Sequence, residues 1–285
     1  MTAALHRRRA AERRLRVAGR LAAALSLVAL LFLLGTMLAG AVGSLGGGFL
    51  TGADATDAAR AGIGGAMLGS LMTLLVALGA ALPIGVAAAV FLEEFARRDR
   101  WTALVEASIN NLAAVPPIVF GLLGLALFLG AWGVPRSSPL VAGLTLALMT
   151  MPVIVIACRA AIRGVPDGVR EAAMAVGASR VQLVFHHVLP LAAPGIVTGA
   201  ILGGARALGE TAPLLLIGMR AFIPAAPSGV SEPVTTLPVQ IFLWADKVDP
   251  GFVGRTSAAI VVLLAVVLVL HGLAAWTRHR FEVRR

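Results

Sequence analysis

The sequence predicts an all-α integral membrane protein with six transmembrane helices. Hydrophobic residues make up 59% of the chain and charged residues 13%, whereas soluble domains carry about 25% charge. The charged residues collect in short groups between long uncharged stretches, which is the pattern of a membrane protein. The basic residues also gather on one side of the predicted topology, in keeping with the positive-inside rule.

Six stretches can each supply the ~20 residues that a helix needs to cross ~30 Å of hydrocarbon. They cover residues 21–53, 61–92, 107–135, 137–158, 194–218 and 256–277. Only the fifth stretch contains charged residues, Arg206 and Glu210. The first apolar run, residues 21–42, exceeds the ~7–15-residue core of a signal peptide, so we expect an uncleaved anchor helix.

The predicted membrane domain, residues 21–277, lies between a basic cytoplasmic segment, 1–20, and a basic cytoplasmic tail, 278–285. With both termini in the cytoplasm, most of the 24 Lys and Arg residues fall in cytoplasmic segments. The outer segments hold Arg60, Arg136, Arg220, Lys247 and Arg255. This bias predicts a multi-pass membrane protein with both termini in the cytoplasm.

Two connections are too long for simple turns, namely a cytoplasmic loop, 159–190, and an outer loop, 219–254, with a Pro-rich segment at 224–229. Long loops often meet partners and ligands. Glu93 and Glu94, after the second stretch, are expected to form a solvated cytoplasmic face. Arg159, after the fourth stretch, is expected to extend its side chain to the membrane interface.

Composition and motifs argue against nucleic-acid, metal and ATP-hydrolysing sites. The net charge of +10 arises mostly from Arg residues at the ends of apolar stretches, rather than on one basic face. His186 and His187 are adjacent, so on a helix they point about 100° apart and cannot share a metal. Lys247 is the single lysine and belongs to no P-loop. We therefore expect no cofactor and no catalytic residue, and any ATP hydrolysis must come from another subunit.

The cytoplasmic loop carries the most specific pattern. Pro166 and Gly168 predict a turn, and Glu171 is expected in the first turn of the short helix that follows. The small apolar face of this helix and the stripe after Gly177 consist of Ala172, Ala173 and Val176, then Val181, Val184, Phe185 and Val188. Small residues let another protein approach closely, and the alternative is a helix that lies on lipid headgroups.

Glu171-Ala172-Ala173, with Gly177 four residues after Ala173 and a Leu189-Pro190 pair further on, resembles the EAA loop of ABC importer permeases. His187 departs from the pattern, because the family often has an apolar residue there. The resemblance implies a type I permease fold. It also implies that Glu171, Ala172, Ala173 and Gly177 belong to a coupling helix that docks onto a cytoplasmic ATPase dimer.

The fifth stretch combines small and charged residues. Gly195, Gly199 and Gly203 share one helix face, where they allow close helix packing within the subunit or against a sister subunit. Arg206 is expected at the middle of the span, where an isolated charge costs at least ~2.5 kcal/mol. Glu210 lies one turn further on and can pair with it. The pair is either a structural ion pair or an anion site on the translocation path.

The run from Arg206 through Glu210, Thr211 and Pro213 to Leu215 resembles phosphate ABC importer permeases of the PstA type. Segments 91–95, 109–111, 116–121 and 237–242 agree with the same family. The family often has an Arg soon after the Pro of the fourth span, whereas here Arg159 comes later. The resemblance implies an all-helical permease with a substrate path near Arg206, Glu210 and Thr211.

The same resemblance implies a location in a bacterial or archaeal inner membrane, in contact with its lipid, and three protein partners. These are a PstC-like second permease, the ATPase dimer and a periplasmic or lipid-anchored phosphate-binding protein. A permease for another oxyanion, such as molybdate or sulfate, is an alternative on the same architecture. An ion-coupled secondary transporter and a membrane scaffold are further alternatives; the first would need a buried carboxylate and internal repeats, and no repeat is evident.

Overall fold

The computed structural model describes the backbone of residues 2–219, 223, 227 and 229–282, and their side chains apart from 2–11, 47, 281 and 282. The described residues form helices, turns and loops, with no β-strand among them. Arg220, most of the Pro-rich segment 224–229 and the last three residues of the basic tail lie outside the described residues. The predicted all-α architecture is confirmed for the described chain.

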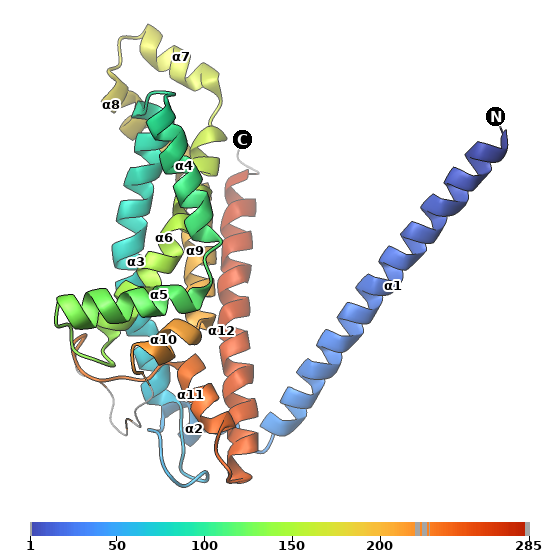
Figure 1. The fold of residues 1–285 in the computed structure, drawn as a ribbon, viewed down its shortest axis with the longest axis vertical. Coiled ribbons are helices and arrows are strands. Elements are labelled where there is room, and N and C mark those ends of the chain that lie inside the picture. The colour runs from blue at the N-terminus through green and yellow to red at the C-terminus, as the bar shows by residue number, and fades with distance from the viewer. Residues whose placement is uncertain (1, 220–222, 224–226, 228, 283–285) are drawn as a thin grey trace.

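Four long helices form the bundle: α3 (Gly64–Val90), α6 (Pro139–Arg163), α9 (Leu189–Gly209) and α12 (Gly251–Glu282). They run side by side in Figure 1, where α6 packs against α3 and α9, and α12 packs against α9. α3 continues into a π-helical segment, η1 (Phe91–Phe95). α9 follows α8 (Arg180–Leu183) and another π-helical segment, η3 (Val184–Val188).

Local signals explain where these helices begin. Ser138 caps α6, since its hydroxyl accepts a hydrogen bond from the Val141 backbone N–H, and Pro139 follows at the first helical position. Asp99 caps α4 (Arg100–Ala113) in the same way. The Thr102 backbone N–H donates to the Asp99 carboxylate at 2.8 Å, and this bond lowers the pKa of Asp99.

The first helix, α1 (Thr2–Ala41), lies at an angle to the bundle and meets it only near its C-terminal end (Figure 1). Its described residues before Ala41 are exposed or partly exposed in this chain. The helix ends at Ala41, well before the predicted boundary at residue 53, and the short α2 (Gly47–Thr51) follows a turn. Glycines in this turn favour an early end to the helix.

Among the described residues, five helices are long and apolar enough to cross a membrane, and a sixth crossing can come from a bent pair. The pair consists of α4 and a second half, α5 (Pro117–Gly124) with η2 (Leu125–Ala131), which meet at 101°. The predicted continuous span at 107–135 is therefore wrong. Pro116 and Pro117 explain the bend, because each lacks a backbone N–H and the residue before a proline avoids helical dihedrals.

Ion pairs between helix ends support six crossings despite the bend. Glu93 at the end of α3 contacts Arg159 near the end of α6, so these two helices run in the same direction. The chain between them, residues 96–138, must therefore return across the bundle. The bent pair accounts for this return.

The region predicted as the outer loop, 219–254, is partly buried helix. α11 (Leu237–Ala245) inserts Leu237, Val239, Gln240 and Trp244 into the core. The Trp244 indole N–H donates to Asp54 at 3.0 Å, which ties α11 to the segment before α3. This part of the predicted outer connection therefore folds as a helix, since the apolar residues of α11 gain stability by packing into the bundle.

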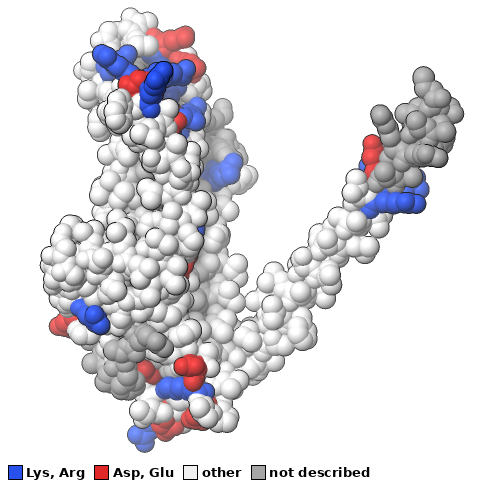
Figure 2. All heavy atoms as spheres, viewed as in Figure 1, with Lys and Arg blue, Asp and Glu red and all other residues white. Residues whose placement is uncertain are grey.

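Charged side chains gather mostly at the two ends of the molecule, with a largely uncharged band between them (Figure 2). The beginning of α1 and the end of α12 lie toward the same end of the molecule as α7 (Asp167–Ala175), as Figure 1 shows. An uncharged band flanked by charged ends is the surface expected of a membrane-spanning bundle.

Candidate coupling surface and translocation site

The fifth predicted span is broken within the bundle. α9 ends at Gly209, Glu210 is extended, and α10 (Ala212–Leu216) begins after Thr211. Figure 1 shows α10 roughly level with the middle of α12. Arg206 therefore lies in the last turn of α9, not at the middle of a continuous helix as the sequence analysis expected. Helix breaks inside membrane bundles are tolerated where they are buried in protein or line a cavity.

Arg206 and Glu210 form a loose pair at this break. Their closest side-chain nitrogen and oxygen atoms, Nε and Oε1, are 3.9 Å apart. The Arg206 side chain is 45% exposed and the Glu210 side chain 20%. A cation in the last turn of α9 also offsets the negative end of the helix dipole. The guanidinium thus keeps donors available for another ligand.

The three glycines of α9 face α6 of the same chain. A Cβ added at Gly195 or Gly199 would lie 2.6 Å from the Cβ of Ala161 or Ala157, respectively. At Gly203 the added Cβ would lie 3.2 Å from the Ile154 Cγ1. The stripe therefore serves packing within this subunit, which was one of the two alternatives.

The predicted coupling helix is α7, followed by α8. Asp167 occupies its first turn, and Glu171 comes one turn later than expected. Ala173 packs inward at 5% exposure, while Glu171 and Ala172 are exposed. Val184 and Val188 are buried but Val181 and Phe185 are exposed, so the predicted stripe faces two ways. The large exposed apolar residues of this loop, which we call the docking surface, are Met174, Val176, Val181 and Phe185.

Gly177 ends α7 in a left-handed conformation with φ of +85°. The Ala178 N–H donates to the Ala173 carbonyl at 3.0 Å and the Gly177 N–H donates to the Met174 carbonyl at 3.0 Å. This pair of bonds is a Schellman motif, in which glycine avoids the Cβ penalty. Space around Gly177 is open within this chain, so the positive φ is what favours glycine here.

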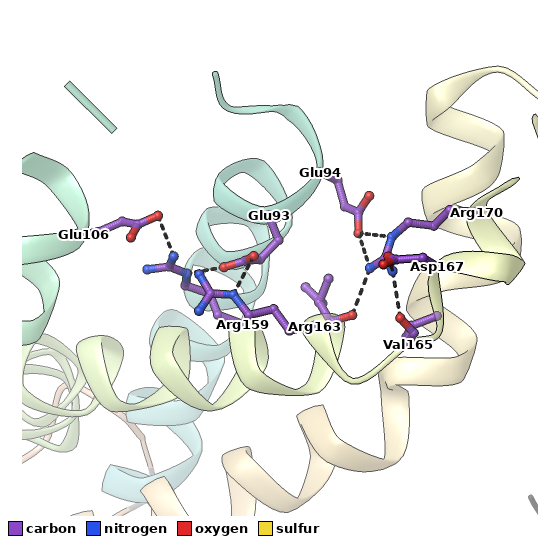
Figure 3. Close-up of polar contacts among 9 residues, drawn as sticks. Glu93, Glu94, Glu106, Arg159, Arg163, Val165, Asp167 and Arg170 are labelled. Carbon is purple, nitrogen blue, oxygen red and sulfur yellow. Dashed lines mark hydrogen bonds and ion pairs between the residues drawn. The ribbon is translucent and has the colours of Figure 1, made fainter. Parts of the chain in front are cut away.

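A charge network joins the ends of α3 and α6 to α4 and α7 (Figure 3). The sequence analysis did not predict it. Arg159 contacts Glu93 at 2.5 Å and Glu106 at 2.6 Å, and Arg163 contacts Glu93 at 2.8 Å. The Arg159 side chain is 8% exposed and that of Glu93 12%. The expectations of a solvated Glu93 and of an Arg159 that reaches the interface are therefore wrong, because each supplies the other's counter-charge.

Arg170 forms the second half of this network. It donates to Glu94 at 2.9 and 3.2 Å, to Asp167 at 3.0 Å, and to the carbonyls of Ile162 at 3.0 Å and Val165 at 2.7 Å. The Glu94 side chain is 8% exposed, so it too is not the solvated residue that was expected. The signal in the sequence was adjacent acids at the end of one apolar stretch and arginines at the end of another on the same predicted side.

Comparison with known proteins gives a consistent picture. A family model described as "binding-protein-dependent transport system inner membrane component" matches residues 81–283. A second model, described as a domain of unknown function, matches residues 2–47. The first match includes α7, the charge network and the break at Arg206.

Curated relatives cover most of the chain. It is 34% identical over 227 residues to the phosphate transport system permease protein PstA 1 of Mycobacterium tuberculosis (strain CDC 1551 / Oshkosh), an alignment that covers 79% of this chain and 73% of the relative. It is 31% identical to the probable ABC transporter permease protein YqgI of Bacillus subtilis (strain 168), over 80% of this chain and 81% of the relative.

Solved structures share the fold at low identity. A chain of the MetNI methionine ABC transporter in an inward-facing conformation superposes with a TM-score of 0.58 and 20% identity, over 77% of this chain and 95% of that chain. A chain of a bacterial alginate ABC transporter gives a TM-score of 0.53 and 16% identity, over 75% of this chain and 77% of that chain.

Proposed function

The chain belongs to the family of binding-protein-dependent transport system inner membrane components, and from this premise we propose that it is the permease subunit of an ATP-driven importer of inorganic phosphate. Relatives named as phosphate permeases align over most of its length, which supports phosphate as the substrate. The observation that carries the proposal is the position of Arg206 at a helix break within the bundle.

The chemistry of Arg206 suits an oxyanion. A guanidinium presents planar N–H donors that match two oxygens of a phosphate at once. The contact with Glu210 is at the outer limit of an ion pair, at 3.9 Å. Glu210 thereby moderates the charge of Arg206 without occupying all of its donors. Thr211, beside the break, would add a hydroxyl that can donate to or accept from the passing anion.

Energy for transport would come from a cytoplasmic ABC ATPase dimer that binds the docking surface and α7. This chain carries no P-loop sequence, and moving an anion requires no covalent step from it. The remaining partners would be a PstC-like second permease and a periplasmic or lipid-anchored phosphate-binding protein. Both termini and α7 would then lie on the cytoplasmic side.

Transport by the purified complex tests this function. The chain, its sister permease, the ATPase and the binding protein are reconstituted in vesicles, with ATP on the side that carries the ATPase. We expect ATP-dependent uptake of phosphate, which excess sulfate or molybdate does not suppress. A complex with a hydrolysis-deficient ATPase is the matched control and should transport nothing.

Two outcomes would replace the proposal. Uptake of sulfate or molybdate in preference to phosphate would assign the chain to another oxyanion importer. Phosphate uptake that follows an ion gradient and ignores ATP would indicate a secondary transporter.

A further inference from the structure

We propose that Arg170 is a positioning residue that fastens α7 to the ends of α3 and α6, so that a displacement of α7 moves these membrane helices with it. The inference rests on the proposed function and adds to it a mechanical link within this subunit. We call the link the clamp; it consists of Arg170, Glu94 and the carbonyls of Ile162 and Val165.

Packing alone attaches α7 weakly. The helix has nine residues, fewer than the ~12–15 that an isolated helix needs to be even marginally stable in water. Ala173, the buried residue of α7, contributes a single methyl group to the core, and the partly buried Val169 packs against the same cluster. A firm attachment therefore depends on polar bonds.

Arg170 supplies those bonds to two different helices at once (Figure 3). Its guanidinium binds Glu94 of η1, which continues α3, and the Ile162 carbonyl in the last turn of α6. The Ile162 carbonyl already accepts a hydrogen bond from the Val165 backbone N–H at 3.1 Å, and Arg170 adds a charged donor to the same oxygen, which strengthens the C-terminal end of α6. Its side chain is 18% exposed and that of Glu94 8%, which limits screening of the pair by water.

The charge network continues from the clamp toward the break at Arg206. Arg159 of α6 binds both Glu93 of η1 and Glu106 of α4. α4 leads into α5, where a Cβ added at Gly121 would lie 2.7 Å from the Pro213 Cα of α10. A contiguous set of contacts thus runs from α7 through α4 and α5 to the helix that follows Arg206, as mechanical coupling requires.

The decisive measurement is the amount of phosphate taken up per ATP hydrolysed by the reconstituted complex. In Arg170→Ala we expect the ATPase to stay bound and active while this ratio falls at least about fivefold, the lower end of ordinary coupling between sites. Arg170→Lys keeps the charge but replaces donors on three separate nitrogens by a single ammonium, so its ratio should be intermediate. Arg180→Ala removes an exposed arginine of the same loop and should leave the ratio unchanged.

A chemical restoration of the clamp separates coupling from simple stability. Glu94 and Arg170 both line a groove of about 740 Å³, so thiols at these positions are accessible to reagents. In a Cys158→Ala background, the double variant Glu94→Cys with Arg170→Cys should be uncoupled. A short linker that joins the two thiols should restore the ratio, whereas the same reagent on either single-cysteine variant should not.

Four results decide the matter. A wild-type ratio in Arg170→Ala, or a linked double variant that assembles but stays uncoupled, overturns the clamp. If Arg170→Ala does not assemble, Glu94→Gln repeats the test with an isosteric neutral partner. If Arg170→Ala, Glu94→Gln and the double cysteine variant all fail to assemble, Arg170 and Glu94 have only a structural role, and the clamp is also overturned. Failure of the wild-type complex to take up phosphate would instead refute the proposed function.

Discussion

Arginine residues in this chain have different roles, set by the part of the bundle in which each lies. Arg159 is buried between two carboxylates that neutralise it. Arg206 has one distant carboxylate partner among the described residues and is half exposed at a helix break. The same side chain is therefore a structural tie in one place and a candidate anion ligand in the other, because burial and pairing decide how many donors remain available.

Substitutions at Arg206 distinguish a substrate ligand from a structural pair. Arg206→Lys keeps the charge but loses the planar fork, so phosphate uptake should fall roughly tenfold, the effect of one charged hydrogen bond. Arg206→Ala with Glu210→Gln removes both charges. We expect this double variant to assemble normally while uptake stays lost, as measured in vesicles alongside co-purification of the ATPase. Arg180→Lys is the control, and recovery of uptake in the double variant would show that the pair is only structural.

At the scale of elements, proline and glycine determine where the helices stop and how closely they pack. Pro116 and Pro117 turn the third predicted span into a bent pair at 101°. Gly199 lets α9 approach α6 so closely that a Cβ at residue 199 would lie 2.6 Å from the Ala157 Cβ. Gly177 ends α7 by adopting a positive φ. Each residue acts through the backbone, and each determines how one element meets the next.

The glycine at the end of α7 provides a test of this view. Gly177→Ala forces an L-residue into the left-handed region, which costs about 1–2 kcal/mol, so retention of the ATPase on the purified complex should decrease. Gly168→Ala, in the same helix with open space and ordinary φ, should have no adverse effect. Gly177→Asn should be milder than Gly177→Ala, because Asn tolerates this conformation. Equal behaviour of all three variants would contradict the backbone role.

The contact between α9 and α6 predicts a compensating pair. Gly199→Ala places a methyl group 2.6 Å from the Cβ of Ala157, and such overpacking typically costs 1–3 kcal/mol. Adding Ala157→Gly removes the clash and should restore thermal stability in detergent. Gly209→Ala, where space is open, is the matched control. A stable Gly199→Ala single variant would show that these helices separate more easily than the structure indicates.

At the scale of the whole molecule, the distribution of charged residues and the relative direction of the helices agree on one topology. Charged residues mark both ends of the bundle (Figure 2), and the beginning of α1, the end of α12 and α7 lie toward one end (Figure 1). The contact between Glu93 and Arg159 makes α3 and α6 parallel. Six crossings, with the bent pair as one of them, satisfy both observations.

Reporter fusions test this topology directly. Fusions at the N-terminus, at Asp167 and at the C-terminus should report the cytoplasm, since the basic segments favour that side. A fusion at Asp57, and one at Ser228, which lies outside the described residues, should report the outside. A cytoplasmic signal at Ser228 would contradict six crossings.

Much of the fold was accessible from the sequence, while the candidate site was accessible only in part. The spans at 61–92 and 137–158 match α3 with η1 and α6 closely, because long uncharged runs have few alternatives to a helix. The pairing of Arg206 with Glu210 followed from a spacing of four residues. The ion pairs of Glu93 and Glu94 were missed, since their partners lie far along the chain and come close only in the bundle.

The sequence by itself determined that this is a helical membrane protein, where most of its spans lie, and that a short helix forms around Glu171. These properties depend on local composition and periodicity, and local patterns can be read along a single chain. The tertiary structure decided that the third span bends, that α11 is buried, that the α9 glycines face α6, and that Arg170 joins three helical elements. Those properties depend on contacts between distant segments, whose energies are defined only once the bundle has formed.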